Sequence, residues 1–183
     1  IEDGIRKYKN WYYGPQQRIA QSLKINNKNK NLISDNKSLI IAWQNHKESR
    51  HKQKYNDSLQ SNRYEDVTIM DIILDFKKSI RKADFNYGIS LRKQNVNSDA
   101  NFSPTNNLLK NTTRYPDGGS KVMDAAVYTQ FKYKVLKNTT IFFGERYNLN
   151  YLTARFNDNS IYNLPYNEIT TNNTSLVSSI LLR

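Results

Sequence analysis

Apolar and polar residues alternate along most of this chain, whereas a helical period is weak almost everywhere. Alternation predicts β-strands with one apolar face, because successive side chains of a strand point to opposite sides. The pattern predicts seven strands, at residues 17–25, 38–52, 64–77, 85–95, 123–135, 139–147 and 175–182.

The clearest predicted strands each place an apolar stripe against a polar one. In residues 85–95 the polar stripe is Asn86, Gly88, Ser90 and Arg92. Glu145 falls on the apolar stripe of its strand and is an exception. The apolar stripes that we expect to face lipid consist of Phe85, Tyr87, Ile89, Leu91, Val127, Phe131, Tyr133, Ile141 and Phe143.

The links between the predicted strands differ in length. Residues 81–83 and 136–138 form short links, whereas residues 98–120 and 156–171 form long ones. If short and long links alternated strictly, the link at residues 26–37 would be short and the link at residues 55–61 would be long. The first is longer, and the second shorter, than this rule requires. Short turns at one end and long loops at the other are typical of barrels in the bacterial outer membrane, where the long loops face outward.

Two all-β classes fit the alternation. A soluble β-sandwich or a lipocalin-like barrel also alternates. Residues 38–52, 64–77 and 123–135 are each much longer than the roughly five or six residues of an average soluble strand. A tilted strand needs about 9–11 residues to cross a membrane. We therefore expect an antiparallel up-and-down sheet that forms part of a transmembrane β-barrel.

Composition agrees with a barrel wall. The chain has 183 residues, a hydrophobic content of 37% and a mean hydropathy of −0.82. Globular domains usually contain roughly 45–50% apolar residues, but a barrel with a wet interior needs fewer. The sequence contains no run of about 20 apolar residues, so it predicts no transmembrane helix. The chain begins at Ile1 without Met and ends at Arg183 within an apolar segment, so we expect residues 1–183 to be a partial β-barrel domain from a longer protein.

The formal net charge of +12 is compatible with binding to nucleic acid, to an anionic membrane surface or to anionic ligands. Lys and Asn are spread along the whole chain, which weakens the case for nucleic acid, and we predict no such partner. Lys47, Arg50, Lys52 and Lys54 lie near the end of one predicted strand. They could steer an anionic chelate, although a solvated rim that meets lipopolysaccharide phosphates is the favoured interpretation.

The sequence lacks the residues and motifs that usually form catalytic or metal sites. Cys is absent, and the two histidines, His46 and His51, are five residues apart and so point to opposite faces of a strand. The chain has no Gly-x-Ser-x-Gly, His-Glu-x-x-His or Walker motif. We therefore predict no enzyme activity, no catalytic residue, no metal site and no cofactor.

Ligand binding is expected in the two long loops. Arg114 and Tyr115 in the first, with Tyr162 and Tyr166 in the second, offer charged and aromatic hydrogen-bonding surface. Gly118 and Gly119 more simply fold the first loop back to the next strand.

Several motifs, in this order, resemble those of TonB-dependent outer-membrane receptors of the Bacteroidetes type. They are residues 11–18 (WYYGPQQR), 48–51 (ESRH), 115–120 (YPDGGS), 125–130 (AAVYTQ), 143–147 (FGERY) and 164–166 (LPY). The resemblance covers nearly the whole chain. Glu145 departs from the apolar residue that the family has there, which leaves the facing of that strand open.

The resemblance implies a barrel of about 22 strands with an N-terminal plug, which this chain does not contain. It also implies uptake across the outer membrane, driven through the plug by the TonB energy-coupling complex. A ferric siderophore or haem is the expected ligand, with glycan or cobalamin nearly as easy to defend. Outer-membrane lipid and lipopolysaccharide would surround the barrel. Two alternatives stay open: a soluble basic β-domain that binds a polyanion, and a porin or adhesin without energy coupling.

Overall fold

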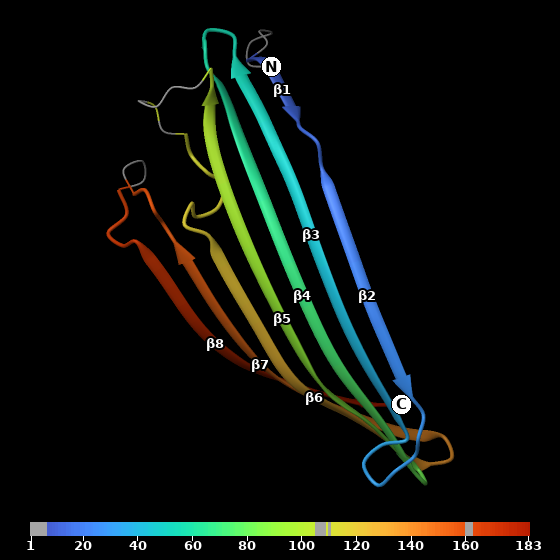
Figure 1. Ribbon diagram of the computed structural model, residues 1–183. Coiled ribbons are helices and arrows are strands. Elements are labelled where there is room, and N and C mark those ends of the chain that lie inside the picture. The colour runs from blue at the N-terminus through green and yellow to red at the C-terminus, as the bar shows by residue number, and fades with distance from the viewer. Residues whose placement is uncertain (1–6, 105–108, 110, 160–162) are drawn as a thin grey trace.

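The computed structural model describes residues 7–104, 109, 111–159 and 163–183. This part of the chain contains no helix, and therefore none that could cross a membrane. It forms eight strands, joined in one antiparallel sheet (Figure 1): β1 Tyr8–Tyr13, β2 Gln17–Asn27, β3 Asn36–Lys54, β4 Gln60–Ile80, β5 Ala83–Ser103, β6 Ser120–Leu136, β7 Thr139–Arg155 and β8 Glu168–Leu182.

The strands from β3 to β8 pair in chain order, each antiparallel to its neighbour. Two-residue turns at 81–82 and 137–138 lie at one end of the sheet, which we call the tight-turn end. The connections 104–119 and 156–167 lie at the other, which we call the long-loop end. The predicted all-β, up-and-down antiparallel fold is confirmed.

β1 and β2 share one edge of β3. β1 pairs with Arg50–Lys54 and β2 with Lys37–Lys47, so together they act as a single interrupted strand. The break falls at Gly14–Gln16, where Pro15 has no N–H to donate to the ladder. A side chain at Gly14 would overlap the Ser49 hydroxyl and the His51 ring, so glycine leaves room for these two side chains.

The register divides the side chains into two faces. One row crosses the sheet with an apolar residue on every strand from β2 to β8: Ile25, Leu39, Leu74, Ile89, Val127, Tyr147 and Leu176. This apolar face includes all nine residues of the predicted lipid-facing stripes. The opposite, polar face carries Asp71, Asp75, Asn86, Ser90, Arg92, Asp124, Tyr128, Gln130, Arg146 and Asn148.

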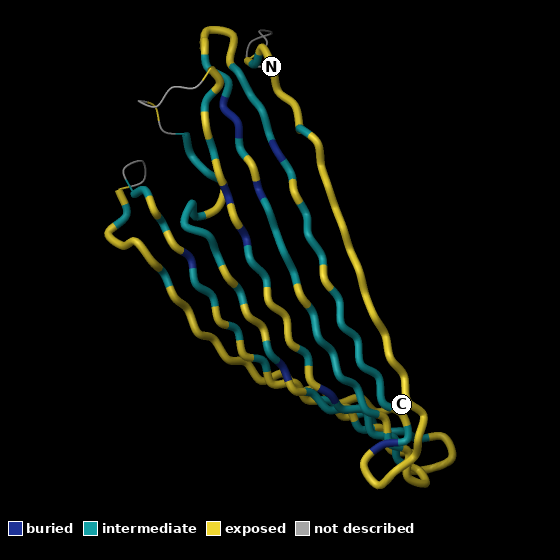
Figure 2. Tube along the Cα trace, in the orientation of Figure 1, coloured by how far each residue is buried: buried dark blue, intermediate teal, exposed yellow. Residues whose placement is uncertain are grey.

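The sheet has almost no core of its own (Figure 2). Val96, Ala126 and Ala154 are the only buried apolar side chains among the described residues. On the apolar face Ile89, Leu91 and Val127 remain 44%, 45% and 51% exposed. The closed apolar core that a soluble β-domain would need is therefore not found in the described part of the chain.

The polar face is hollowed. Cavities of about 440, 500 and 590 Å³ are lined mainly by its side chains. Tyr128 lies across Gly88 and donates a hydrogen bond to the Asp75 carboxylate. A Cβ at Gly88 would come within 2.6 Å of the Tyr128 hydroxyl oxygen, so glycine makes room for the ring.

Several predicted boundaries were wrong. The sequence pattern missed β1, whose aromatic residues lie on both faces and so do not alternate. It also ended β5 at residue 95 instead of Ser103 and β7 at residue 147 instead of Arg155, and it began β8 at residue 175 instead of Glu168. In the β5 extension the apolar residues Val96, Ala100 and Phe102 lie on the face opposite to Ile89 and Leu91, so the apolar stripe is interrupted although backbone pairing continues. The first long loop is thus 104–119 instead of 98–120, and the second is 156–167 instead of 156–171.

Candidate functional site

The candidate site lies on the polar face at the long-loop end, where β3, β4 and β5 extend beyond β6. β6 pairs with β5 only as far as Val96, opposite Ser120. Residues 97–103 of β5 continue upward beside β4 alone (Figure 1). The chain that returns to β6, residues 111–119, packs against this exposed upper part of the sheet.

Polar side chains hold the returning segment in place. The Asn111 amide donates to the hydroxyl of Ser61 at 2.9 Å and to the carbonyls of Asn62 at 3.2 Å and Asn101 at 2.7 Å. The Arg63 guanidinium donates to the Thr112 hydroxyl. Because these contacts bridge β4 and β5, the segment covers the polar face at this height.

Arg114 reaches across the sheet to β3. Its Nη1 donates to Glu48 Oε1 at 2.9 Å, and Arg50 Nη2 donates to the same oxygen at 2.9 Å. Arg114 also lies over the ring of Tyr115 at 5.4 Å, and Arg50 lies over the ring of Tyr13 at 5.1 Å. One carboxylate therefore joins β3, β1 and the returning segment through two arginines that each stack on a tyrosine.

Glu65 lies beneath this cluster. It stands directly opposite Glu48 in the ladder and is only 4% exposed. Neither carboxyl oxygen has a hydrogen-bond partner among the described residues. Burial, with a smaller contribution from Glu48, raises the pKa of Glu65 above its ordinary value, although Arg50, Arg114 and Arg63 oppose the shift.

The two long loops are joined through Asp117. Its carboxylate accepts the backbone N–H groups of Asn157 at 2.8 Å and Asp158 at 3.0 Å. Gly118 donates to the Arg155 carbonyl at 2.9 Å, and Gly119 has a φ of +87°, a conformation that favours glycine. The two glycines thus turn the loop back to β6, as the sequence indicated.

The structure brings together two of the four predicted ligand-binding residues. Arg114 and Tyr115 lie in the cluster described above. Tyr166 belongs to the second loop, where its ring packs 6.1 Å from Phe156, and no ring contact with Tyr115 is found among the described residues. Tyr162 lies outside the described residues.

The predicted basic set shares an end of β3 but not a face. Lys47 lies on the apolar side of the sheet and pairs with Asp66 at 3.4 Å, whereas Arg50 lies on the polar side. Sequence analysis missed Glu48, Glu65 and Arg63 as members of the site. Their spacing gives no signal, because only the register between β3 and β4 places Glu48 opposite Glu65.

The two histidines also divide between the faces. His46 pairs with Val67 and His51 with Asn62. His51 Nδ1 lies 2.7 Å from Asn62 Oδ1, and its ring stacks on Tyr12 at 4.8 Å. No group of three or more His, Asp or Glu with metal-binding geometry occurs in the described part of the chain.

Comparison with known proteins supports the fold. No family model matches the chain, and no curated protein matches it. Among solved structures, the chain is similar to the ferric yersiniabactin uptake receptor FyuA from Yersinia pestis, with a TM-score of 0.51 and 14% sequence identity. The match covers 91% of this chain but 25% of that receptor, so the chain spans about a quarter of its length. At this identity the likeness shows that the sheet resembles part of an outer-membrane receptor barrel.

Proposed function

We propose that this chain forms part of the wall of a TonB-dependent outer-membrane receptor, with its apolar face toward lipid and its polar face toward the barrel interior. The observation that carries the proposal is the apolar row from Ile25 to Leu176, which crosses the sheet without a polar residue. Such a row needs an apolar surrounding, and the described residues provide no second layer to cover it.

The dimensions agree with a bilayer. On β6 the apolar stripe runs from Ala125 to Val135, which is roughly 34 Å of strand at about 3.4 Å per residue. At a tilt of about 40° the stripe has a height of about 26 Å, close to the roughly 25 Å apolar band of outer-membrane barrels. Charged groups at this height pair on the opposite face, where Arg92 Nε lies 2.6 Å from Asp71 Oδ1. Glu145, opposite Thr129 and Ser178, and Lys78, opposite Phe85, are charged exceptions on the lipid side.

The finer proposal concerns uptake. The long loops would face outward and bind a scarce nutrient complex, and a plug outside this chain would receive energy from the TonB complex. The structural neighbour takes up a ferric siderophore, which supports an iron complex of siderophore or haem type as the ligand. The Bacteroidetes assignment rests on the sequence motifs alone. Arg114 and Tyr115, at the mouth, are the residues that we expect to contact ligand, with Tyr166 and Tyr162 from the second loop.

A pair of adjacent residues tests the orientation. The chain has no Cys, so Ile89→Cys and Ser90→Cys can each be labelled singly in the parent protein in intact cells. We expect Ile89→Cys to react only with a lipid-phase probe. We expect Ser90→Cys, its matched control on the opposite face, to resist that probe. Equal labelling of both positions by a water-soluble reagent would contradict the barrel.

Energy-coupled uptake needs a separate test. Cells that lack the parent gene should lose energy-dependent accumulation of radioactive iron supplied as a siderophore or haem complex. Restoring the gene with Arg114→Ala should weaken uptake more than restoring it with Lys121→Ala. Uptake that persists without inner-membrane energy would indicate a porin instead.

A further inference from the structure

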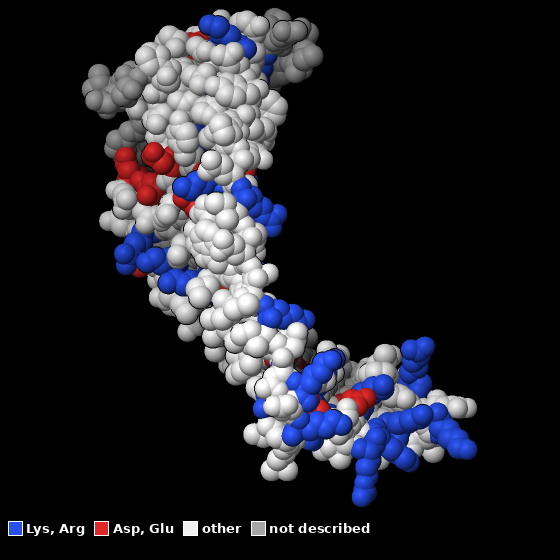
Figure 3. Space-filling view, turned by 45° about the vertical axis from the view of Figure 1, so that its right-hand side comes forward, with Lys and Arg blue, Asp and Glu red and all other residues white. Residues whose placement is uncertain are grey.

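The chain's positive charge is concentrated at the tight-turn end. Residues 24–37, 77–86, 130–140 and 183 meet at this end and contain twelve Lys or Arg and two Asp. They therefore carry a formal charge of +10, whereas the rest of the chain, with sixteen basic and fourteen acidic residues, carries only +2. Figure 3 shows Lys and Arg side chains projecting together from this end of the molecule.

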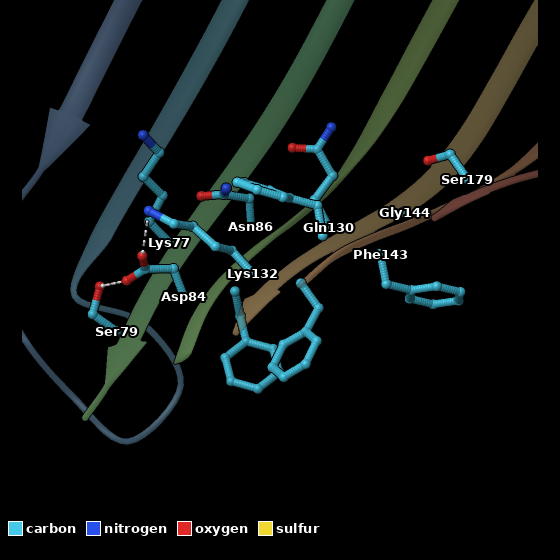
Figure 4. Close-up of a pocket in the computed structure, with 12 residues that line it drawn as sticks. Lys77, Ser79, Asp84, Asn86, Gln130, Lys132, Phe143, Gly144 and Ser179 are labelled. Carbon is cyan, nitrogen blue, oxygen red and sulfur yellow. Dashed lines mark hydrogen bonds and ion pairs between the residues drawn. The ribbon is translucent and has the colours of Figure 1, made fainter. Parts of the chain in front are cut away.

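Not all of these cations are available to a partner. The two acidic residues of this end each hold one lysine: Asp35 pairs with Lys78 at 3.0 Å, and Asp84 pairs with Lys132 at 3.7 Å. The Ser79 hydroxyl also donates to Asp84 at 2.7 Å, and this group lines the hollow on the polar face together with Lys77 (Figure 4). Lys77 and Lys132 lie on the polar, interior face of the wall, whereas Lys78 lies opposite Phe85 on the apolar face and is held there by Asp35.

Of the other nine cations, Lys24 and Lys134 lie on the polar face and Arg183 follows β8. The last six occupy the turns, the β2–β3 loop and the apolar face. Lys37 shares the apolar face with its ladder partner Phe76, and the other five lie in the turns and the β2–β3 loop. No carboxylate lies within 4 Å of any of them in the described part of the chain. We call these six residues the basic collar: Lys28, Lys30, Lys37, Arg81, Lys82 and Lys137.

An aromatic girdle lies directly beside the collar. Phe76 and Tyr87 stack at 5.2 Å, and Phe85 and Phe131 pack at 4.8 Å, all on the apolar face. Aromatic rings gather where a membrane barrel passes from hydrocarbon to headgroups. Lys37 is level with Phe76, and Arg81 lies five residues beyond it along β4, roughly 13 Å of height at a tilt of about 40°. The collar thus begins at the level of the lipid phosphates and extends into the water next to them.

Resting on the orientation proposed above, we infer that the basic collar binds the anionic phospholipid headgroups of the leaflet at the tight-turn end. The interaction is electrostatic attraction of lysine and arginine to lipid phosphates, with the aromatic girdle fixing the depth of the collar. Each cation near an anionic surface contributes about a fivefold preference for charged over neutral lipid. The collar gives the wall a strong preference for that leaflet, because the opposite end has almost no net charge.

Spin-labelled lipids test this inference in the full-length parent protein reconstituted in phosphatidylcholine bilayers. We expect spin-labelled phosphatidylglycerol to associate with the protein about fivefold more strongly than spin-labelled phosphatidylcholine at low salt. High salt should remove the preference by screening. The triple variant Lys37→Gln, Arg81→Gln and Lys82→Gln should also remove it.

A matched triple variant, Lys52→Gln, Lys54→Gln and Lys121→Gln, removes the same charge at the long-loop end and should retain the preference. A wild-type protein without the preference, or an equal loss in both triple variants, would overturn the inference. If the tight-turn triple instead abolished preference for lipopolysaccharide, the collar would face the other leaflet and the inference would also be wrong. A protein that immobilises no lipid at all would refute the barrel orientation itself, so the two failures are distinguishable.

Discussion

Arg114 is the residue whose loss should most clearly release the first long loop. It makes one hydrogen bond to the Glu48 carboxylate at 2.9 Å, and its side chain is 40% exposed. A hydrogen bond to a charged group contributes about 1.5–3 kcal/mol when buried, and partial exposure reduces this to about 1–2 kcal/mol. Arg114→Ala should therefore favour local opening of residues 111–119 by about 5- to 30-fold.

Hydrogen exchange of the parent protein in detergent measures this opening. The Tyr115 amide, which lies 3.4 Å from the Ser98 hydroxyl, should exchange about 5- to 30-fold faster in Arg114→Ala. The Gly118 amide, bonded to the Arg155 carbonyl at 2.9 Å, should change little. Lys121→Ala removes a nearby positive charge and serves as the control. Unchanged exchange at Tyr115, or equal acceleration in the control, would show that Arg114 does not anchor the loop.

Three further predictions concern the wall, the second loop and pH. Gly88→Ala should destabilise the folded protein by about 1–3 kcal/mol in denaturant titrations, because the new Cβ would overlap the Leu74 carbonyl and the Tyr128 hydroxyl. Gly144→Ala should change stability by less than about 0.5 kcal/mol, because the tightest contact of its Cβ would be the Ser179 hydroxyl at 3.0 Å. Asp117→Ala should accelerate exchange of the Asn157 amide about tenfold, and unaltered exchange would refute the link between the loops. The pKa of Glu65 is raised above its ordinary 4.5, so its contribution to stability is present below pH 4.5 and is lost as pH rises through the raised pKa. Glu65→Gln should remove this pH dependence, which is measured as the denaturation midpoint from pH 4 upward.

Much of the wall could be predicted because its physical cause is local. In Phe85, Tyr87, Ile89 and Leu91 the alternation is visible in a single strand, and the register confirms that all four share one face. β1 could not be predicted, because Trp11 and Tyr12 put aromatic side chains on opposite faces and only pairing with β3 makes the segment a strand.

The candidate site could be predicted only in part. Arg114 and Tyr115 stand out in the sequence as charged and aromatic residues of a long loop. Their partner Glu48 lies 66 residues away, and the direct opposition of Glu48 and Glu65 depends on the register of β3 with β4. No spacing rule along the chain carries that information.

The sequence by itself determined the class of fold, the two-faced strands and the unequal ends, because side-chain alternation and turn residues act within a few positions of one another. Tertiary structure decided which residues become neighbours across strands. It aligned the apolar row from Ile25 to Leu176, placed Glu65 beneath the returning loop and gathered a charge of +10 at the tight-turn end. Such neighbours are set by register, and a shift of one residue would move every side chain of a strand to the other face.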